Sequence, residues 1–217
     1  MKHAVLVGLL LLAPVVVQAN SIISAAADGS PAAVRQLTNA GVNPNIADSF
    51  GWTPLMHAAA YNPDPSVLQI LLNAGAHANA SDPYGWTALI AAAQYNKHPA
   101  AVQILLHAGA EVNARTRDDW TPLLLAARYN ESPSVAQILI DSGADVHARS
   151  ATGWTPLIFA ARYNENPAVI QVLLDAGADV DARSDLGATP LNNAAAHNPN
   201  PAVLQLLIDA GAEHAGP

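Results

Sequence analysis

The sequence predicts an all-α solenoid of stacked helix-turn-helix units with protruding β-turns. The first observation is a pentapeptide that returns at steps of 34 residues. Its copies are Gly51–Leu55, Gly85–Leu89, Asp119–Leu123, Gly153–Leu157 and Gly187–Leu191. The second observation is that further positions keep the same period, among them the columns that begin at Asn62, Pro65 and Gly75. Self-similarity at this period indicates units that cannot bury their apolar faces alone and therefore stack on their neighbours.

Each unit starts with the chemistry of a short helix. Thr53 can cap a helix with its hydroxyl, and Pro54 suits the first helical position, where a backbone N–H is not needed. Small residues such as Ala58 and Ala59 follow, so that a second layer can approach closely. Asn62 stands where this helix should end, and we expect it to adopt the left-handed conformation of a C-terminal cap.

A second helix follows in the same unit. One column is expected to supply its N-cap, and each member of it precedes a Pro: Asp64, His98, Ser132, Asn166 and Asn200. Residues 67–72 carry a broad apolar face, and Gly75 is the expected terminator because glycine accepts a positive φ. An extended stretch then leads to the turn at Tyr84 and Gly85.

These motifs resemble the ankyrin repeat. The likeness runs through Gly-Trp-Thr-Pro-Leu, the following Ala-Ala, the apolar second helix with its Ala-Gly-Ala end and the terminal Asn-Ala, and it covers most of the chain. Two features depart from the family pattern. The unit has 34 residues instead of about 33, with the extra residue between the paired helices. The residue after Leu, commonly His in the family, is here Met56, Ile90, Leu124, Ile158 or Asn192, so we expect apolar packing in place of a histidine hydrogen bond.

The repeat sets the domain organisation. Residues 1–19 are assigned to a signal peptide and residues 20–50 to a divergent N-terminal capping unit. The later units are 51–84, 85–118, 119–152, 153–186 and a C-terminal unit at 187–217. The last outer helix stays apolar from Val203 to Ile208, so we expect it to leave an apolar flank exposed or to be covered, with self-association as one outcome.

The first 19 residues differ from the rest of the chain. Lys2 and His3 precede an apolar stretch that ends at Ala13, and Val17-Gln18-Ala19 offers the small residues that a signal peptidase reads. This pattern predicts a bacterial export signal, and the alternative is an N-terminal anchor helix. The stretch is short for a membrane span, and no other segment is apolar enough to cross a bilayer. We therefore expect a periplasmic or secreted protein, with no membrane association after signal removal.

Composition argues against several classes of function. The chain has no Cys, so neither a disulfide framework nor a thiolate metal site is available. Asp and Glu number 17 against 9 Lys and Arg, which disfavours nucleic-acid binding and favours a protein partner with a basic surface. The His residues are scattered, and no phosphate loop or serine elbow interrupts the repeat. We predict no cofactor, no metal site and no enzymatic activity.

The resemblance implies a binding surface made of the protruding turns and the inner helices. Ten of the eleven aromatic residues fall in these positions or in the Trp column beside them. Two columns are identical through four units: Trp52, Trp86, Trp120 and Trp154, and Tyr61, Tyr95, Tyr129 and Tyr163. Identical columns indicate a framework in which each ring packs on its neighbour, whereas surface aromatic residues favour a binding face. The sequence leaves both interpretations open.

Positions that vary between units are the better candidates for specificity. The variable residues of the central units are Arg117, Asp118, Arg128 and Arg162. Arg128 and Arg162 share a column beside two Trp residues, so we expect cation–π contacts. The alternative is an ion pair with a neighbouring carboxylate such as Glu131 or Glu165. The predicted partner-binding site comprises Arg117, Asp118, Trp120, Arg128, Tyr129, Trp154, Arg162 and Tyr163.

These observations favour an exported protein that binds another protein and has no catalysis of its own. One version is an inhibitor or self-protection protein that occludes a hydrolase of the periplasm. The alternative is a secreted effector that binds host proteins, and an enzyme is a remote third class.

Overall fold

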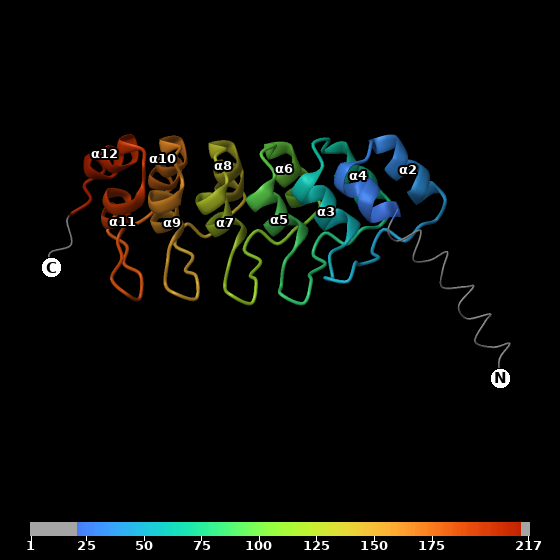
Figure 1. Ribbon diagram of the computed structural model, residues 1–217, viewed down its shortest axis with the longest axis horizontal. Coiled ribbons are helices and arrows are strands. Elements are labelled where there is room, and N and C mark those ends of the chain that lie inside the picture. Colours follow the sequence, from blue (N-terminus) through green and yellow to red (C-terminus); the bar gives the residue numbers. More distant parts are fainter. Residues whose placement is uncertain (1–20, 214–217) are drawn as a thin grey trace.

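Two rows of short helices run the length of the molecule (Figure 1). The computed structural model describes residues 21–213, and the predicted signal peptide lies outside this range. Residues 21–28 are helical and open the first unit. The helices that follow are α2 (Pro31–Asn39), α3 (Pro54–Tyr61), α4 (Ser66–Asn73), α5 (Ala88–Tyr95), α6 (Pro99–His107), α7 (Pro122–Tyr129), α8 (Pro133–Asp141), α9 (Pro156–Tyr163), α10 (Pro167–Asp175), α11 (Pro190–His197) and α12 (Pro201–Asp209).

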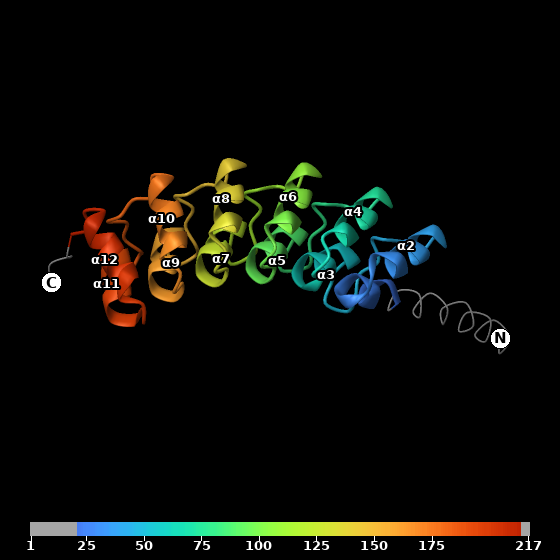
Figure 2. The same ribbon diagram turned by 90° about the horizontal axis from the view of Figure 1, so that it is seen from above.

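The helices form an inner and an outer row. The inner row consists of α3, α5, α7, α9 and α11, and the outer row of α2, α4, α6, α8, α10 and α12 (Figures 1 and 2). Loops project beside the inner row, and each ends in a tight hairpin such as residues 48–52, where the Asp48 N–H donates to the Trp52 carbonyl (3.0 Å). The predicted all-α solenoid with protruding turns is confirmed. Within residues 21–213, every helix lacks the length or the apolar character that crossing a bilayer requires.

Threonine hydroxyls start the inner helices, as predicted. The Oγ1 of Thr53 accepts a hydrogen bond from the backbone N–H of Met56 (3.4 Å). The later inner helices repeat this cap at Thr87, Thr121, Thr155 and Thr189. Each cap satisfies one of the N–H groups that the first turn of a helix leaves without a partner.

The outer helices begin less uniformly than the sequence predicts. Asn166 and Asn200 cap α10 and α12 with their side chains, but His98 and Ser132 make no side-chain cap hydrogen bond. Helix α4 begins at Ser66, one residue later than expected, with the Pro before it in the cap position. The Pro column therefore fixes where these helices start more reliably than the side chain before it, because Pro supplies a helical φ in every unit.

Glycine ends the outer helices, as predicted. Gly75 has a φ of 93°, and the N–H of the next residue, Ala76, donates to the carbonyl of Leu71 (2.9 Å). This closure satisfies the last carbonyls of the helix, and it needs a residue without a Cβ penalty at positive φ. The hairpins use a separate column of glycines. Among the described residues Asp119 is the one residue other than glycine with a positive φ (60°), and it occupies the hairpin position where other units have Gly.

The Asn column does not act as predicted. Asn62 has φ −74° and ψ 124°, which is extended backbone and not the left-handed cap. Its side-chain amide donates to the carbonyls of Ala26 (2.9 Å) and Gly29 (3.1 Å) in the preceding unit, and its Oδ1 accepts from the N–H of Asp64 (2.9 Å). The arrangement recurs at Asn96, Asn130, Asn164 and Asn198. A ladder of amides thus joins each unit to the one before it and pairs backbone groups that burial would otherwise leave unsatisfied.

Apolar packing takes the position that the family commonly gives to His, as predicted. Met56, Ile90, Leu124 and Ile158 are all fully buried, whereas Asn192 in the last unit is exposed. One cluster of buried apolar side chains extends from Ile22 to Leu207, so the core continues through every stacked unit. At the C-terminal end, α12 buries Val203 and Leu207 and leaves Ile208 with 45 % of its surface exposed.

Candidate functional site

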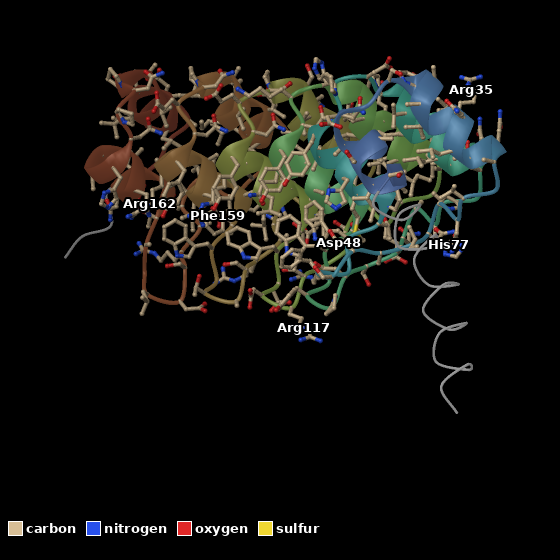
Figure 3. All side chains as sticks on the ribbon, turned by 45° about the vertical axis from the view of Figure 1, so that its right-hand side comes forward. Arg35, Asp48, His77, Arg117, Phe159 and Arg162 are labelled. Atoms are coloured by element: carbon tan, nitrogen blue, oxygen red, sulfur yellow. The ribbon has the colours of Figure 1, made fainter. Side chains whose placement is uncertain are left out.

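Aromatic side chains gather between the hairpins and the inner helices (Figure 3). We call this surface the aromatic face, and it consists of the Trp and Tyr columns together with Phe50, Tyr84 and Phe159. The Trp rings are half-buried, but Tyr61, Tyr95, Tyr129 and Tyr163 keep 55, 44, 48 and 43 % of their surface exposed. Among the described residues, Leu186 and Ile208 are the exposed large apolar side chains that lie outside this face.

In the N-terminal region, residues 48–118, the rings pack directly on one another. The centroids of Trp52 and Trp86 are 6.0 Å apart, and those of Tyr61 and Tyr95 are 5.7 Å apart. Within each unit the Trp and Tyr rings stack at 6.3 and 6.2 Å. Burial, and then the nearby phenols of Tyr61 and Tyr129, raise the pKa of Tyr95, so this phenol stays neutral. The Trp and Tyr columns therefore form a ladder of packed rings, in which the Tyr rings stay exposed to solvent.

Two carboxylates close the hairpins of this region. One oxygen of Asp82 accepts the N–H groups of Tyr84 and Trp86 (2.8 Å each), and the other accepts the indole N–H of Trp52 (3.1 Å). Asp48 accepts the N–H groups of Phe50 and Trp52 in the same way, and its second oxygen meets Nε2 of His57 (2.9 Å).

The same contacts hold Asp48 in its ionised form. Partial burial raises the pKa of Asp48, but the hydrogen bonds from His57 and from the backbone of Trp52 and Phe50 outweigh that effect. The pKa of Asp48 therefore lies below its ordinary value of 3.8. The group carries its negative charge at neutral pH.

These side chains enclose an open pocket of about 390 Å³ between the first two hairpins. Its walls are Asp48, Phe50, Trp52, His57, Tyr61, Asp82, Tyr84 and Trp86. We call it the acidic aromatic pocket. Rings cover most of its walls, and the ionisable groups among its lining residues are two aspartates, one histidine and two tyrosine phenols. No basic Lys or Arg lines it.

In the central region, residues 119–186, an arginine takes part in the ring packing. Phe159 inserts between Trp120 (4.7 Å) and Trp154 (4.9 Å), measured between ring centroids. The guanidinium carbon of Arg128 lies 5.5 Å from the Trp120 ring, 5.5 Å from Phe159, 4.7 Å from Tyr129 and 4.3 Å from Tyr163. Its Nε is buried without a hydrogen-bond partner. The contacts that this structure gives the guanidinium are with ring faces, which the ring quadrupole makes favourable for a cation.

Arg162 repeats part of this arrangement in the next unit. Its guanidinium carbon lies 5.7 Å from Trp154 and 5.2 Å from Tyr163, and its Nη1 donates to Oδ1 of Asn193 (3.1 Å). The predicted cation–π contacts of both arginines are therefore confirmed. The alternative pairing with Glu131 or Glu165 is not found among the described residues. Glu131 instead lies 3.7 Å from Lys97.

Two of the predicted site residues lie apart from the ring cluster. Arg117 and Asp118 belong to the hairpin before Trp120, and both are exposed. Arg117 projects from the tip of its hairpin (Figure 3), and its guanidinium lies 5.9 Å from the ring of Tyr84 in the preceding hairpin. The structure thus groups Trp120, Arg128, Tyr129, Trp154, Arg162 and Tyr163, and places Arg117 and Asp118 at the adjoining hairpin.

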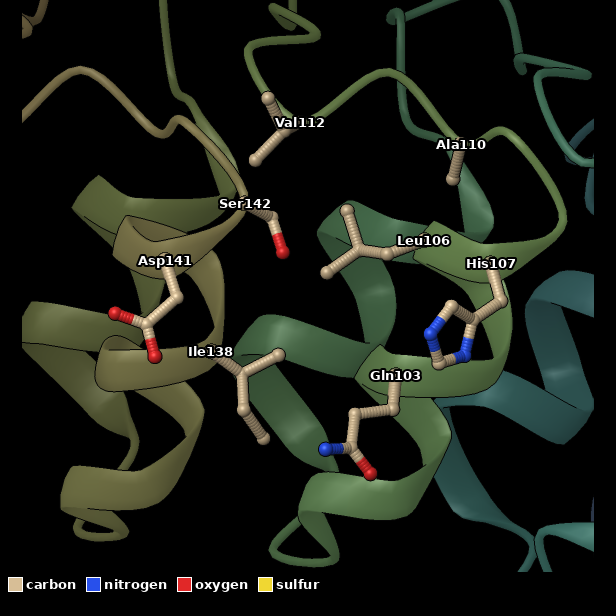
Figure 4. A pocket seen from close by; sticks show the side chains of 8 residues that line it. All are labelled: Gln103, Leu106, His107, Ala110, Val112, Ile138, Asp141 and Ser142. Atoms are coloured by element: carbon tan, nitrogen blue, oxygen red, sulfur yellow. The ribbon is translucent and has the colours of Figure 1, made fainter.

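A second hollow lies on the outer row and offers no comparable chemistry. It is a groove of about 350 Å³ between α6 and α8, with Leu106 and Ile138 at its centre. His107 and Asp141 lie on opposite sides of it (Figure 4). A similar groove separates α2 from α4, so these hollows follow from the spacing of the outer helices. Within residues 21–213 no group of His, Asp and Glu side chains could hold a metal ion.

Sequence reasoning missed Phe159 and the acidic aromatic pocket. The signal was available in the columns, because the hairpin position of Asp48 and Asp82 is Thr116, Ser150 and Ser184 in later units. A change from carboxylate to hydroxyl along one column marks a local difference in charge.

The family assignment agrees with the geometry. A family model for ankyrin repeats (3 copies) matches residues 22–116, 66–150 and 123–215. The chain therefore belongs to the ankyrin repeat family. A search of the curated proteins returned no match. Ankyrin repeats are protein–protein interaction modules, and proteins built from them are typically non-catalytic scaffolds.

Proposed function

We propose that this protein binds a folded partner protein through the aromatic face and performs no catalysis. The observation that carries the proposal is the Tyr column, in which four rings in register keep 43 to 55 % of their surface exposed. Tyr and Trp dominate the energetics of protein interfaces because they bury a large apolar area and keep a polar end. A row of such rings on one face is an interaction surface.

The central region forms the middle of the proposed interface. Tyr129 and Tyr163 present exposed rings there, and Arg117 and Asp118 project from the adjoining hairpin. The two inner-helix arginines and the half-buried Trp rings support these side chains from beneath. A rigid, preformed surface loses little conformational entropy on binding, which favours affinity.

Charge favours a partner with a basic surface. The chain carries 17 acidic and 9 basic residues, and its formal net charge is −8 at pH 7. Complementary charge accelerates encounter, and salt screens that effect. Association with the partner should therefore slow as ionic strength rises.

Replacement of two exposed rings tests the interface. The double variant Tyr129→Ala with Tyr163→Ala should lose capture of the partner from native extract by at least about tenfold, because interface hot spots cost about 2 kcal/mol or more. Leu186→Ala is the matched control, since this side chain is 94 % exposed on another hairpin. Mass spectrometry identifies a protein retained by the wild type and the control. Retention by the double variant would overturn the proposal.

We also propose that the protein is exported and acts in the periplasm as an inhibitor or self-protection protein for a hydrolase. The pattern in residues 1–19 supports export. Cell fractionation with N-terminal sequencing should find the chain outside the cytoplasm and beginning at Asn20, and an intact cytoplasmic Met1 would contradict it. A hydrolase among the captured proteins supports inhibition, whereas capture of host proteins supports the alternative of a secreted effector.

Self-association through α12 is a separate proposal that rests on the exposed Ile208. Sedimentation should show a dimer for the wild type and a monomer for Ile208→Lys. A monomeric wild type would overturn it.

A further inference from the structure

We infer that the acidic aromatic pocket binds the guanidinium group of an arginine side chain supplied by the partner protein. This inference rests on the proposed function and adds the chemistry of one contact. The pocket lies in the N-terminal region, apart from the side chains that form the middle of the proposed interface.

The central region contains a template for this contact within the same chain. In the central region the guanidinium of Arg128 lies 4.3 to 5.5 Å from four rings, two of which belong to the Tyr column and one to the Trp column. Trp52, Tyr61 and Trp86 of the pocket belong to the same two columns. The chain thus already places an arginine guanidinium on rings of these two columns in the central region.

In the N-terminal region no Lys or Arg lines the pocket beside these rings, and the basic side chain in its lining is His57, whose Nε2 lies 2.9 Å from Asp48. The column that supplies Arg128 and Arg162 contains Ala60 and Gln94 in the earlier units. The position of Phe159, which fills the space between two Trp rings, is Ala91 in the unit 85–118. These small or neutral residues leave the pocket open, and the Phe159 position of the unit 51–84 is His57, which forms part of the lining. Arg117 lies 5.9 Å from the ring of Tyr84 but is not part of the lining.

Asp48 and Asp82 provide more acceptor atoms than the hairpins need. Closing the hairpin requires one acceptor atom, and hydroxyl oxygens provide it in later units, where Thr116, Ser150 and Ser184 accept the equivalent N–H. Asp48 and Asp82 use one oxygen for that role and turn the second oxygen to His57 and to the Trp52 indole. Each second oxygen retains acceptor capacity. The hairpins therefore do not require the negative charges of Asp48 and Asp82. A bound cation is stabilised by them.

The chemistry selects arginine over lysine. A guanidinium is planar, weakly hydrated and able to stack on a ring while donating hydrogen bonds to a carboxylate at its edge. An ammonium is strongly hydrated and forms no comparable stack. The volume of about 390 Å³ lies at the lower end of the range for small-ligand sites, about 300 to 1,000 Å³. One arginine head with its apolar stem fits a site of this size.

A titration with a single amino-acid derivative tests the inference on the intact mature protein. The probe is N-acetyl-arginine methylamide, and the readout is the NMR resonance of each Trp indole N–H. We expect saturable shifts at Trp52 and Trp86, and none at Trp120 and Trp154, which act as internal controls. The corresponding citrulline derivative has nearly the same shape without the charge, and it should produce no saturable shift. Equal responses to both derivatives would overturn the inference, as would shifts at all four indoles.

Three variants locate the site. Asp48→Asn should weaken binding of the arginine derivative by about fivefold, the worth of roughly 1 kcal/mol for one partly exposed charge. Asp118→Asn removes the same charge at an exposed hairpin position outside the pocket and should change affinity by less than about twofold. Ala60→Arg places in this region the side chain that Arg128 supplies in the central region, so it should block the probe. Unchanged binding by both Asp48→Asn and Ala60→Arg would overturn the assignment.

The two proposals fail in different ways. If the probe does not bind but the partner is still captured through Tyr129 and Tyr163, the arginine site is wrong and the interface stands. If the probe binds but no partner is captured, the pocket is real and the proposed interface fails. A lysine derivative that binds as tightly as the arginine derivative would overturn the selectivity argument.

Discussion

The N-terminal and central regions of the aromatic face use the same two columns of rings and arrive at opposite electrostatic states. In residues 48–118 the Trp and Tyr rings pack on one another beside Asp48 and Asp82. In residues 119–186 Phe159 separates the Trp rings, Arg128 covers Trp120 and Arg162 covers Trp154, and hydroxyls replace the carboxylates in the hairpins. The central region therefore places an arginine among its own rings, whereas the rings and carboxylates of the N-terminal pocket have no Arg or Lys in the lining and only His57 as a basic neighbour.

This difference teaches where specificity lies in a repeat array. The identical rings build the frame, either by packing on one another, as Trp52 and Trp86 do, or by packing on Phe159, as Trp120 and Trp154 do. The residues between the rings decide whether a stretch of the frame is closed or open to a ligand. Ala60 and Arg128 occupy one column, Ala91 and Phe159 occupy another, and these differences separate the uncovered rings from the covered ones.

The largest expected effect on stability comes from Phe159, because the N-terminal region has no phenylalanine in this column. Phe159 is 5 % exposed between two Trp rings, so Phe159→Ala should lower the free energy of unfolding by about 3 kcal/mol or more. His57 occupies the same column in the N-terminal region and is less buried, so His57→Ala should cost about 1 kcal/mol. Urea unfolding followed by Trp fluorescence measures both. Equal losses would mean that the two regions do not differ in packing.

The next effect concerns the cation among the rings. Arg128→Glu replaces attraction to four ring faces by repulsion and puts a carboxylate where no donor is available, which should cost about 2 kcal/mol of stability. Gln94→Glu introduces a glutamate in the same column of the N-terminal region. It should change the free energy of unfolding by less than about 0.5 kcal/mol. The measurement is again the urea midpoint. A neutral Arg128→Glu would show that its ring contacts contribute little to the fold.

Local chemistry made most of the fold predictable from the sequence. The Thr-Pro pairs, the terminal glycines and the 34-residue period fixed the helices and their stacking. The role of Asn62 was not predictable in this way, because a helix-ending Asn can serve its own turn or a neighbouring unit. Only the relative position of adjacent units selects the second role, with bonds to Ala26 and Gly29.

The candidate site was predictable in part. The contacts of Arg128 and Arg162 with rings followed from a shared column, since residues one period apart lie side by side in a stack. The pocket was not anticipated, because Asp48 reads in the sequence as an ordinary turn residue. Its second oxygen meets His57 of the same unit, and it lines a pocket only when the following hairpin brings Asp82 and Trp86 alongside.

A smaller effect separates the structural role of a hairpin carboxylate from its charge. Asp48→Ser gives the first hairpin the acceptor that Ser150 provides in the central region, so stability should change by less than about 0.5 kcal/mol. Asp48→Ala removes the acceptor and leaves two N–H groups without it, which should cost about 1 kcal/mol. Thermal unfolding distinguishes the two variants. A large loss in Asp48→Ser would show that the fold itself requires the charge.

The smallest effect is the dependence of that hairpin on pH. The pKa of Asp48 in the folded protein lies below 3.8, because hydrogen bonds to the ionised form outweigh its burial. In acid the unfolded chain therefore takes up a proton at this position before the folded chain does. The stabilisation is present above about pH 4 and is lost as the pH falls through the pKa of the folded state. The difference in unfolding free energy between the wild type and Asp48→Asn should be constant near neutrality and shrink below pH 4. The comparison cancels the lowered pKa of Asp64, which both proteins share. A difference that stays constant into strong acid would mean that the folded hairpin does not favour the ionised carboxylate. Ionisation of Asp48 would then add nothing to the stability of the hairpin, although the carboxylate would still carry its charge at neutral pH.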